Sequence, residues 1–238
     1  MDCPKCGRTP RAGALECLGC GIIFEKYQAR RAARAARPDG DSPLGIWLRE
    51  LFWEMRPHEN PVILGARALL WLGLVIWSLS FMAATIESNY AGRSFMHLIN
   101  LPFHEAGHIF FRPFGDFTAS LGGTLGQMLM PLICLVVLLF KTRDPFGAAV
   151  ALWWLGQNFF DIAPYVNDAR TLSLPLLGGN YGHSSPYGFH DWEFILTESG
   201  LIQYDHAIAR GCVALGSVIF ILALSWAAAL IYQQYRNR

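Results

Sequence analysis

Charged residues are scarce in this chain: Asp, Glu, Lys and Arg make up only 16% of it, against about 25% in a typical soluble domain. Hydrophobic residues make up 53% and aromatic residues 13%. The charge is also uneven, because residues 1–60 are polar and charged whereas the remainder is mostly apolar. This pattern excludes an ordinary soluble domain over most of the chain. It predicts a water-exposed head followed by a membrane-embedded body.

An apolar leader is also missing, since the N-terminal residues are polar and rich in cysteine. We therefore expect no cleavable signal peptide. The formal net charge is only +1, which gives no reason to expect a nucleic-acid partner.

Four of the six cysteines form two C-x-x-C pairs, and a glycine follows each pair: Cys3 and Cys6, then Cys17 and Cys20. Two such pairs can supply four thiolates to one tetrahedral zinc ion, and the glycines suit tight turns around sulfur. Disulfides or a thioredoxin-like redox pair are the alternatives. So short a segment has almost no core, which favours a metal that holds it together. We predict a structural zinc ribbon over residues 1–27 that binds a cytosolic protein partner.

Reduced thiolates place this ribbon in the cytosol. We therefore expect a multi-pass protein of the cell (inner) membrane whose N-terminus is cytosolic. Residues 28–60 are predicted to be a basic linker followed by an interfacial helix. An Ala/Arg-rich helix over residues 25–37 can face anionic lipid headgroups or simply solvent. Residues 46–56 carry Trp47 and Trp53 among charged residues at helical spacing, which predicts an amphipathic helix lying on the membrane.

The body, residues 61–238, contains four apolar segments long enough to cross a bilayer as helices: 62–86, 118–140, 146–166 and 207–232. Polar residues interrupt a further segment, residues 92–112, which we predict to be re-entrant or a fifth span. If it is re-entrant, the basic residues near position 141 and at the C-terminus lie in the cytosol, as the positive-inside tendency prefers. The predicted fold is an all-α polytopic membrane protein with a small N-terminal zinc-ribbon domain.

The interrupted segment contains His104-Glu105-Ala106-Gly107-His108, the pattern H-E-x-x-H. On a helix, positions i and i+4 share one face, so both imidazoles can reach a single metal ion. Glu105 lies beside them, where it can hold and deprotonate a metal-bound water. The alternative is a helix with two buried structural histidines. Ionisable groups in apolar surroundings are costly and usually functional, which favours the metal site.

A catalytic zinc needs a third protein ligand and one open position. The best donors are Asp168 and, alternatively, Asp161, near the end of the 146–166 segment. We expect Pro164 to break the helix, so that Asp168 projects from an irregular segment lining a cavity. Asn158 is a candidate for binding substrate. In the alternative interpretation these polar groups only cap the end of the helix.

These two elements together resemble the site-2 protease family of intramembrane zinc metallopeptidases. That family pairs H-E-x-x-H with an Asp from an Asn…Pro…Asp-Gly motif on a later helix, and Asn158, Pro164 and Asp168 match the second motif in part. The resemblance covers about residues 95–170, although alanine replaces the final glycine. It implies that His104 and His108 are zinc ligands and that Glu105 is the general base. It also implies that Asp168 is the third zinc ligand.

Residues 169–206 form a long polar and glycine-rich stretch, which is typical of a lid beside a pocket. His183 or His190 within it can donate to a developing oxyanion, complete the metal shell, or be an ordinary loop residue. We count His190 among the candidate substrate-binding residues.

The expected function is intramembrane zinc proteolysis: a zinc-bound water, activated by Glu105, hydrolyses peptide bonds of membrane-embedded substrates. One zinc is then catalytic and one structural. The expected partners are the lipid bilayer, a membrane-protein or peptide substrate, and the protein that binds the ribbon. Two other functions stay open. One is a metal-dependent lipid or amide hydrolase, and the other is a catalytically silent metal-binding membrane scaffold that acts through its ribbon.

Overall fold

The computed structural model describes residues 3–4, 6–10, 14–28, 42–54 and 61–237. The chain divides into two compact units, Met1–Leu48 and Arg49–Arg238, so the boundary falls inside the predicted interfacial helix of residues 46–56. The described residues are mainly helical. They contain two isolated β-bridges but no extended β-strand. Of the predicted Ala/Arg-rich helix, residues 24–28 are helical, and the rest lies outside the described residues.

The first unit is organised by two matching turns, each of which ends in a glycine. The amide of Gly7 donates to the carbonyl of Cys3 at 2.9 Å, and the amide of Gly21 donates to the carbonyl of Cys17 at 2.7 Å. Both glycines have positive φ angles, 72° and 67°. Other residues are strained in this left-handed region, so a glycine after each C-x-x-C pair allows the chain to turn around the sulfur atoms.

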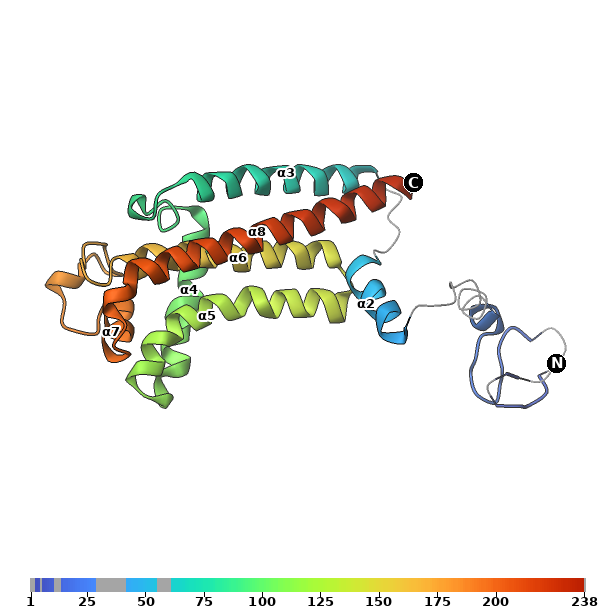
Figure 1. The fold of residues 1–238 in the computed structure, drawn as a ribbon. Coiled ribbons are helices and arrows are strands. Elements are labelled where there is room, and N and C mark those ends of the chain that lie inside the picture. Colours follow the sequence, from blue (N-terminus) through green and yellow to red (C-terminus); the bar gives the residue numbers. More distant parts are fainter. Residues whose placement is uncertain (1–2, 5, 11–13, 29–41, 55–60, 238) are drawn as a thin grey trace. The chain divides into compact units, whose positions relative to one another are not determined.

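The second unit is a helical bundle. Its long helices are α3 (Pro61–Ala83), α5 (Asp116–Val136), α6 (Pro145–Asn167) and α8 (Asp205–Arg236). A π-helical turn, η3 (Val137–Thr142), continues α5. The shorter helices are α2 (Pro43–Trp53), which begins in the first unit, α4 (Phe95–Phe111) and α7 (Asp191–Glu198). In Figure 1 the long helices run lengthwise, whereas α4 runs across them.

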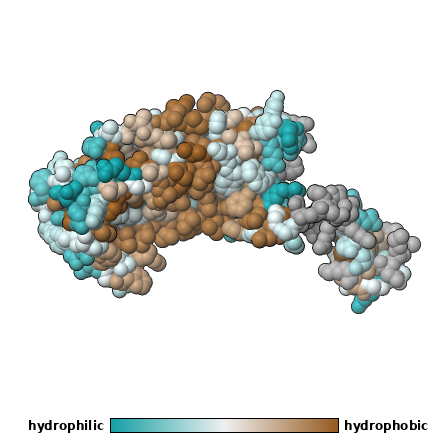
Figure 2. Space-filling view, in the orientation of Figure 1, coloured by the Kyte–Doolittle hydropathy of each residue, from teal (hydrophilic) through white to brown (hydrophobic). Residues whose placement is uncertain are grey.

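Three helices of the described residues are long and apolar enough to cross a membrane: Pro61–Ala83, Asp116–Thr142 and Ile202–Arg236. They match three of the four predicted spans. The fourth, α6, has 23 residues like α3 but carries Gln157, Asn158 and Asp161, and all three are buried within the bundle. Its assignment as a full span stays a prediction. Figure 2 shows hydrophobic side chains over the middle of the body, between more hydrophilic ends.

Helix α4 carries the H-E-x-x-H motif and is one continuous helix of 17 residues, even though it contains Pro102. Its length is about 25 Å, less than the roughly 30 Å of a bilayer core. Three glycines allow it to cross α5 closely. A Cβ on Gly107 would clash with the carbonyl oxygen of Gly122, and a Cβ on Gly126 would clash with that of Phe103. These glycines therefore permit the close crossing, since small residues let helix backbones approach.

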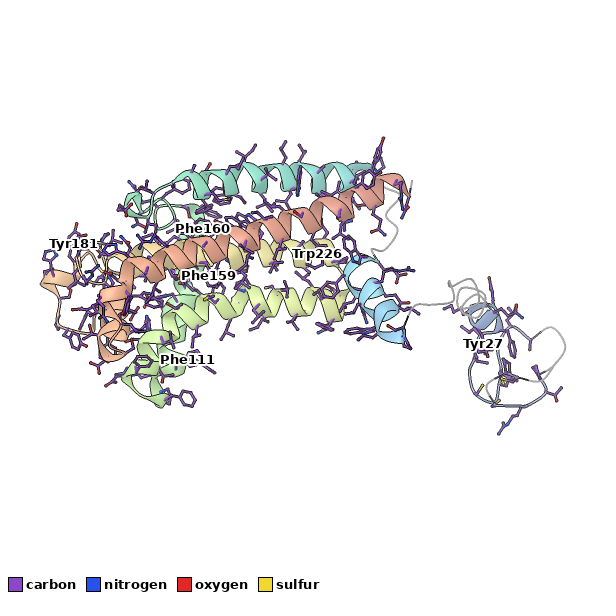
Figure 3. The ribbon with its side chains drawn as sticks, in the orientation of Figure 1. Tyr27, Phe111, Phe159, Phe160, Tyr181 and Trp226 are labelled. Atoms are coloured by element: carbon purple, nitrogen blue, oxygen red, sulfur yellow. The ribbon has the colours of Figure 1, made fainter. Side chains whose placement is uncertain are left out.

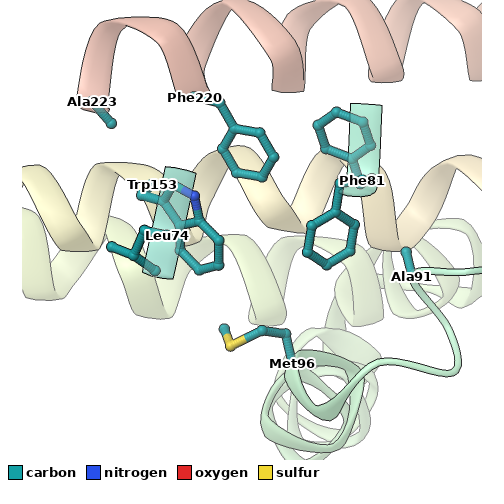
Figure 4. Packing of buried hydrophobic residues seen from close by; sticks show 8 residues of the cluster. Leu74, Phe81, Ala91, Met96, Trp153, Phe220 and Ala223 are labelled. Atoms are coloured by element: carbon teal, nitrogen blue, oxygen red, sulfur yellow. The ribbon is translucent and has the colours of Figure 1, made fainter. Parts of the chain in front are cut away.

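The hydrophobic core packs side chains of α6 against those of α8 and α3. Phe220 stacks on Trp153 and Phe160, with ring centroids 5.2 and 5.0 Å apart and planes within 13°. Figure 4 shows Phe81 and Leu74 of α3 beside these rings. Stacked aromatic pairs add stability beyond the area they bury. The core thus fixes the position of α6.

One expectation about α6 is wrong. Pro164 does not break the helix, which continues to Asn167, and Asp168 is its C-terminal cap. The amide of Asp168 donates to the carbonyl of Pro164 at 2.9 Å, so the last turn of α6 keeps its i to i−4 hydrogen bond. A proline inside a helix removes one amide donor and crowds the carbonyl group four residues earlier, and α6 tolerates both effects. Beyond the cap, Arg170 donates two hydrogen bonds, of 2.8 and 2.7 Å, to the fully buried carboxylate of Asp205 on α8.

Candidate metal centres

The first candidate centre is the group of four cysteines. The sulfur atoms of Cys3 and Cys20 lie 3.6 Å apart, as do those of Cys6 and Cys17, and all four lie within 4.8 Å of one another. Zinc–sulfur bonds of about 2.3 Å place neighbouring sulfurs about 3.8 Å apart around a tetrahedral ion. None of the four forms a disulfide, which would need a sulfur separation near 2.05 Å. The geometry therefore fits one structural zinc ion.

One thiol of this group, that of Cys20, needs a cation to ionise at neutral pH. The amide of Ile22 lowers the pKa of Cys20, but burial and the neighbouring thiols outweigh it and raise this pKa to about 12. A thiol with that pKa is protonated at neutral pH, whereas a metal ion displaces the proton. Binding of a metal would therefore release protons and hold the unit together.

The second candidate centre begins with the two histidines of α4. His104 and His108 lie one turn apart, with ring centroids 4.7 Å apart. The Nδ1 atom of His108 lies 2.8 Å from the carbonyl oxygen of Ala119, and that of His104 lies 3.0 Å from Oε1 of Gln127. A carbonyl oxygen only accepts, so each Nδ1 carries the proton. Both Nε2 lone pairs are then free to bind a metal, as in sites where an outer partner fixes the tautomer.

The third member of this group is Asp191, the first residue of α7. Its Oδ2 atom lies 3.1 Å from Nε2 of His104 and 3.2 Å from Nε2 of His108. Without a cation, both contacts would require doubly protonated imidazoles, two positive charges against one carboxylate. With a metal ion, all three atoms act as ligands. Zinc bonds of about 2.0–2.1 Å place tetrahedral ligands about 3.3 Å apart, close to the observed distances.

Gly123 of α5 leaves the space that this arrangement needs. A Cβ at this position would lie 2.6 Å from Nε2 of both His104 and His108. Real side chains do not approach that closely, so any other residue here would displace the two imidazoles. The residues present therefore fit a metal ion bound by two nitrogens and one carboxylate oxygen.

The centre opens into a cavity of about 1160 Å³. Its wall includes His104, His108 and Asp191, and also Glu105, which lies next to the first ligand on α4. The cavity is lined by residues of α4, α5, α6 and the segment from Pro175 to Phe194. Three ligands beside an open space are typical of a catalytic zinc site, in which the fourth position is left for water or substrate.

The predicted third ligand, Asp168, is not a member of this group. Its Oδ1 atom accepts hydrogen bonds from the hydroxyls of Thr171 and Ser173 at 2.5 and 2.7 Å, and its Oδ2 atom accepts from the amide of Leu174 at 2.8 Å. Burial raises the pKa of Asp168, but the nearby His190 ring, the Thr171 hydroxyl and the amides of Leu174 and Ser173 outweigh it and hold the pKa well below its ordinary range. These bonds commit the carboxylate to the loop, so the structure favours Asp191 as the third ligand.

His190 connects Asp168 to the metal group. It is only 1% exposed, and its Nδ1 atom caps α7 by accepting from the amide of Glu193 at 3.1 Å. The proton therefore lies on Nε2, which faces Oδ2 of Asp168 at 3.6 Å. The next residue is Asp191. His190 also lines the cavity, so both a positioning role and its predicted contact with substrate are compatible with its location.

The other predicted residues are not members of the metal group, although Asp161 lines the same cavity. Asp161, the alternative ligand, accepts from Asn100 at 2.9 Å and contacts His97 at 3.0 Å, which engages both carboxylate oxygens. Asn158 is fully buried, donates to the carbonyl of Trp154 at 3.0 Å, and is not part of the cavity wall. This candidate substrate-binding residue therefore lies in the interior of the bundle and not in the cavity. His183 is exposed, and its Nδ1 lies 3.0 Å from the carbonyl oxygen of Leu172.

Asp191 was missed because nothing in its local sequence marks a ligand. The nearest signal was His190, which sequence reasoning named as a residue able to complete the metal shell. No family model, no curated protein and no solved structure matches this chain. The resemblance to site-2 proteases therefore rests on the residues and spacings themselves.

Proposed function

We propose that this chain is a zinc-dependent membrane peptidase that hydrolyses peptide bonds of membrane-associated polypeptides. One observation carries the proposal: Nε2 of His104, Nε2 of His108 and the Asp191 carboxylate converge on one point in the wall of a cavity that also contains Glu105. When bound there, zinc supplies Lewis-acid chemistry that polarises a carbonyl group and acidifies water.

The residues of this chain would divide the remaining work. His104, His108 and Asp191 hold the ion, and Gln127 and the Ala119 carbonyl orient the two imidazoles. Glu105 is not needed as a ligand. Its position in the motif suits it to take a proton from the attacking water and to pass it to the leaving nitrogen. The cavity offers room for an extended polypeptide beside these groups.

Zinc bound by the four cysteines has a different proposed role. Four thiolates fill a tetrahedral shell and leave no position for water, so that ion is structural. The first unit would then serve to bind a partner protein. A lipid or amide hydrolase that uses the same ligands, and a scaffold that acts only through the first unit, are the competing functions.

The test compares the wild-type chain with three variants expressed in cells: Glu105→Gln, His104→Ala and, as a matched control, Glu87→Gln. Glu87 is exposed and is not part of the cavity wall. Zinc content is measured on purified protein, and new polypeptide N-termini in the membranes are identified by mass spectrometry. Wild type and the control should bind two zinc ions and generate the same new termini.

The Glu105→Gln variant should keep both zinc ions but lower the cleavage rate by about 10²–10⁴-fold, the typical effect of a lost general base. His104→Ala should lose one zinc ion and all cleavage. New termini that do not depend on Glu105 would refute the peptidase. Glu105-dependent changes in lipids without new termini would favour the lipid hydrolase. A Glu105→Gln variant that matches wild type in every assay would favour the scaffold.

A further inference from the structure

The two ends of the helical body differ in their charge. At one end, which we call the basic end, α3 and α6 begin and α8 finishes. Three contacts identify it. Arg67 of α3 donates to Gln234 of α8 at 2.9 Å and lies 3.8 Å from Asp144, the N-terminal cap of α6. In addition, Trp226 of α8 donates to the carbonyl of Phe52 on α2. Figure 3 shows Trp226 beside α2.

The opposite end, which we call the site end, holds the cavity. Here α3 finishes, α6 finishes and α8 begins, as the pair between Arg170 and Asp205 shows. The contact of Asp191 with both motif histidines belongs to this end, as does Tyr181 in the loop before α7 (Figures 1 and 3). The cavity therefore lies near one hydrophilic end of the bundle, beyond the most apolar part of the spans.

Lys and Arg are distributed very unequally between the two sides. By sequence, fifteen of the nineteen either precede α3 in the chain or belong to segments at the basic end: residues 1–60, the first turns of α3, the connection between α5 and α6, and the end of α8. Only four belong to the site end: Arg93, Arg112, Arg170 and Arg210. Of these, Arg170 is neutralised by the buried carboxylate of Asp205.

Membrane proteins keep segments rich in Lys and Arg in the cytosol, and charges close to the spans count most. We propose that the basic end is cytosolic, and that the metal cavity opens at the non-cytosolic face of the membrane. The path of the chain agrees, because α3, α5, α6 and α8 alternate in direction and return the chain to the side on which α3 began (Figure 1).

This orientation assigns the two metal centres to opposite sides. The described residues before α3 contain no candidate span, so connectivity places the four-cysteine unit on the cytosolic side. Its reduced thiols are suited to that compartment. The polypeptide that reaches the cavity would then be a segment exposed at the non-cytosolic surface, while a protein bound to the four-cysteine unit acts from the cytosol.

Labelling of single added cysteines in the full-length chain tests the orientation. Thr197 is exposed on α7 at the site end and outside the cavity wall, and Thr142 is exposed in η3, which continues α5 to the basic end. Thr197→Cys and Thr142→Cys are therefore a matched pair. Each is expressed in cells, and sealed right-side-out and inverted membrane vesicles are treated with a membrane-impermeant maleimide. Labelled peptides are identified by mass spectrometry, so the native cysteines remain in place.

The Thr197→Cys variant should be labelled in right-side-out vesicles and protected in inverted ones, and the Thr142→Cys variant should show the reverse. Labelling of the Thr142→Cys variant in right-side-out vesicles, or protection of the Thr197→Cys variant there, would overturn the proposal. The experiment needs neither bound zinc nor cleavage. Its failure would reverse the orientation and leave the peptidase proposal to its own test.

Discussion

The two candidate metal centres of this chain differ in what surrounds their ligands. The four-cysteine group comes from two short turns close together in the sequence, and its own sulfur atoms can complete a tetrahedron. The histidine group combines α4 with α7, far along the chain, and its three ligands lie in a cavity wall. A filled shell suits a structural ion, and a shell with one open position suits a catalytic ion. The two candidate centres are therefore suited to different roles.

The centres should also depend on folding in opposite ways. The four-cysteine unit is too small for a hydrophobic core, so its metal must create the fold. The body has a core of stacked aromatic rings that does not involve the metal. Its centre is therefore assembled by the fold, and loss of the ion should leave the helices in place.

Cys17→Ser should abolish zinc binding by the first unit and unfold it, because structural zinc contributes about 10–16 kcal/mol to such small domains. The body should keep its own zinc ion. Zinc analysis and hydrogen exchange of the purified variant measure both effects. Cys134→Ser, in the spanning helix α5, is the matched control and should keep two zinc ions. A first unit that stays protected from exchange without zinc would contradict the contrast.

Gly123→Ala should remove the metal from the body, because its Cβ would lie 2.6 Å from both ligand nitrogens. We expect a loss of zinc affinity larger than the roughly 100-fold seen when an outer partner of a ligand is removed. Titration with a competing chelator measures it. Gly73→Ala on α3, where a Cβ would meet no atom within 4 Å, should have no effect. Equal zinc affinity in the two variants would show that the histidines do not bind a metal at this point.

Asp168→Asn should weaken zinc binding by about 10–100-fold without abolishing it, since Asp168 acts through His190 and the loop that presents Asp191. Asp191→Asn should remove the ion. The same competition titration measures both variants, and a matched thermal unfolding curve shows whether the body is intact. If Asp168→Asn lost the zinc and Asp191→Asn kept it, the ligand would be Asp168, as the resemblance implies.

Asp161→Asn should have the smallest effect on zinc affinity, because its carboxylate contacts His97 and Asn100, not the metal group. It should instead destabilise the body by roughly 1–3 kcal/mol, the cost of disturbing a buried hydrogen-bonded group. Thermal unfolding in detergent and zinc titration separate the two effects. A loss of zinc greater than that of Asp168→Asn would return Asp161 to the list of ligands.

The sequence was informative wherever a feature depends on neighbouring residues. C-x-x-C spacing fixes which four thiols meet, and the spacing in H-E-x-x-H places two imidazoles one turn apart. The long helices begin and end close to their predicted positions, as α6 does at Pro145 and Asn167. The third ligand could not be found in this way, because Asp191 meets α4 only after α6, a long loop and α7 have folded.

Two further errors have the same origin. Pro164 was expected to end α6, but helix breaking by proline depends on whether the surrounding packing replaces the lost hydrogen bond. Asp168 matched a family motif in sequence, yet its oxygen atoms accept bonds from its own loop. Both outcomes depend on contacts made by the folded chain, which local patterns do not contain. The buried pairing of Asp161 with Asn100 belongs to the same class.

The most direct test of the account is an anomalous difference map, recorded at the zinc absorption edge from crystals of the full-length chain. The account predicts two peaks. One lies among Cys3, Cys6, Cys17 and Cys20, and the other lies about 2.0–2.2 Å from Nε2 of His104, Nε2 of His108 and a carboxylate oxygen of Asp191, with its fourth position open to the cavity. A second peak bound by Asp168 instead of Asp191, or no peak beside the two histidines, would contradict it.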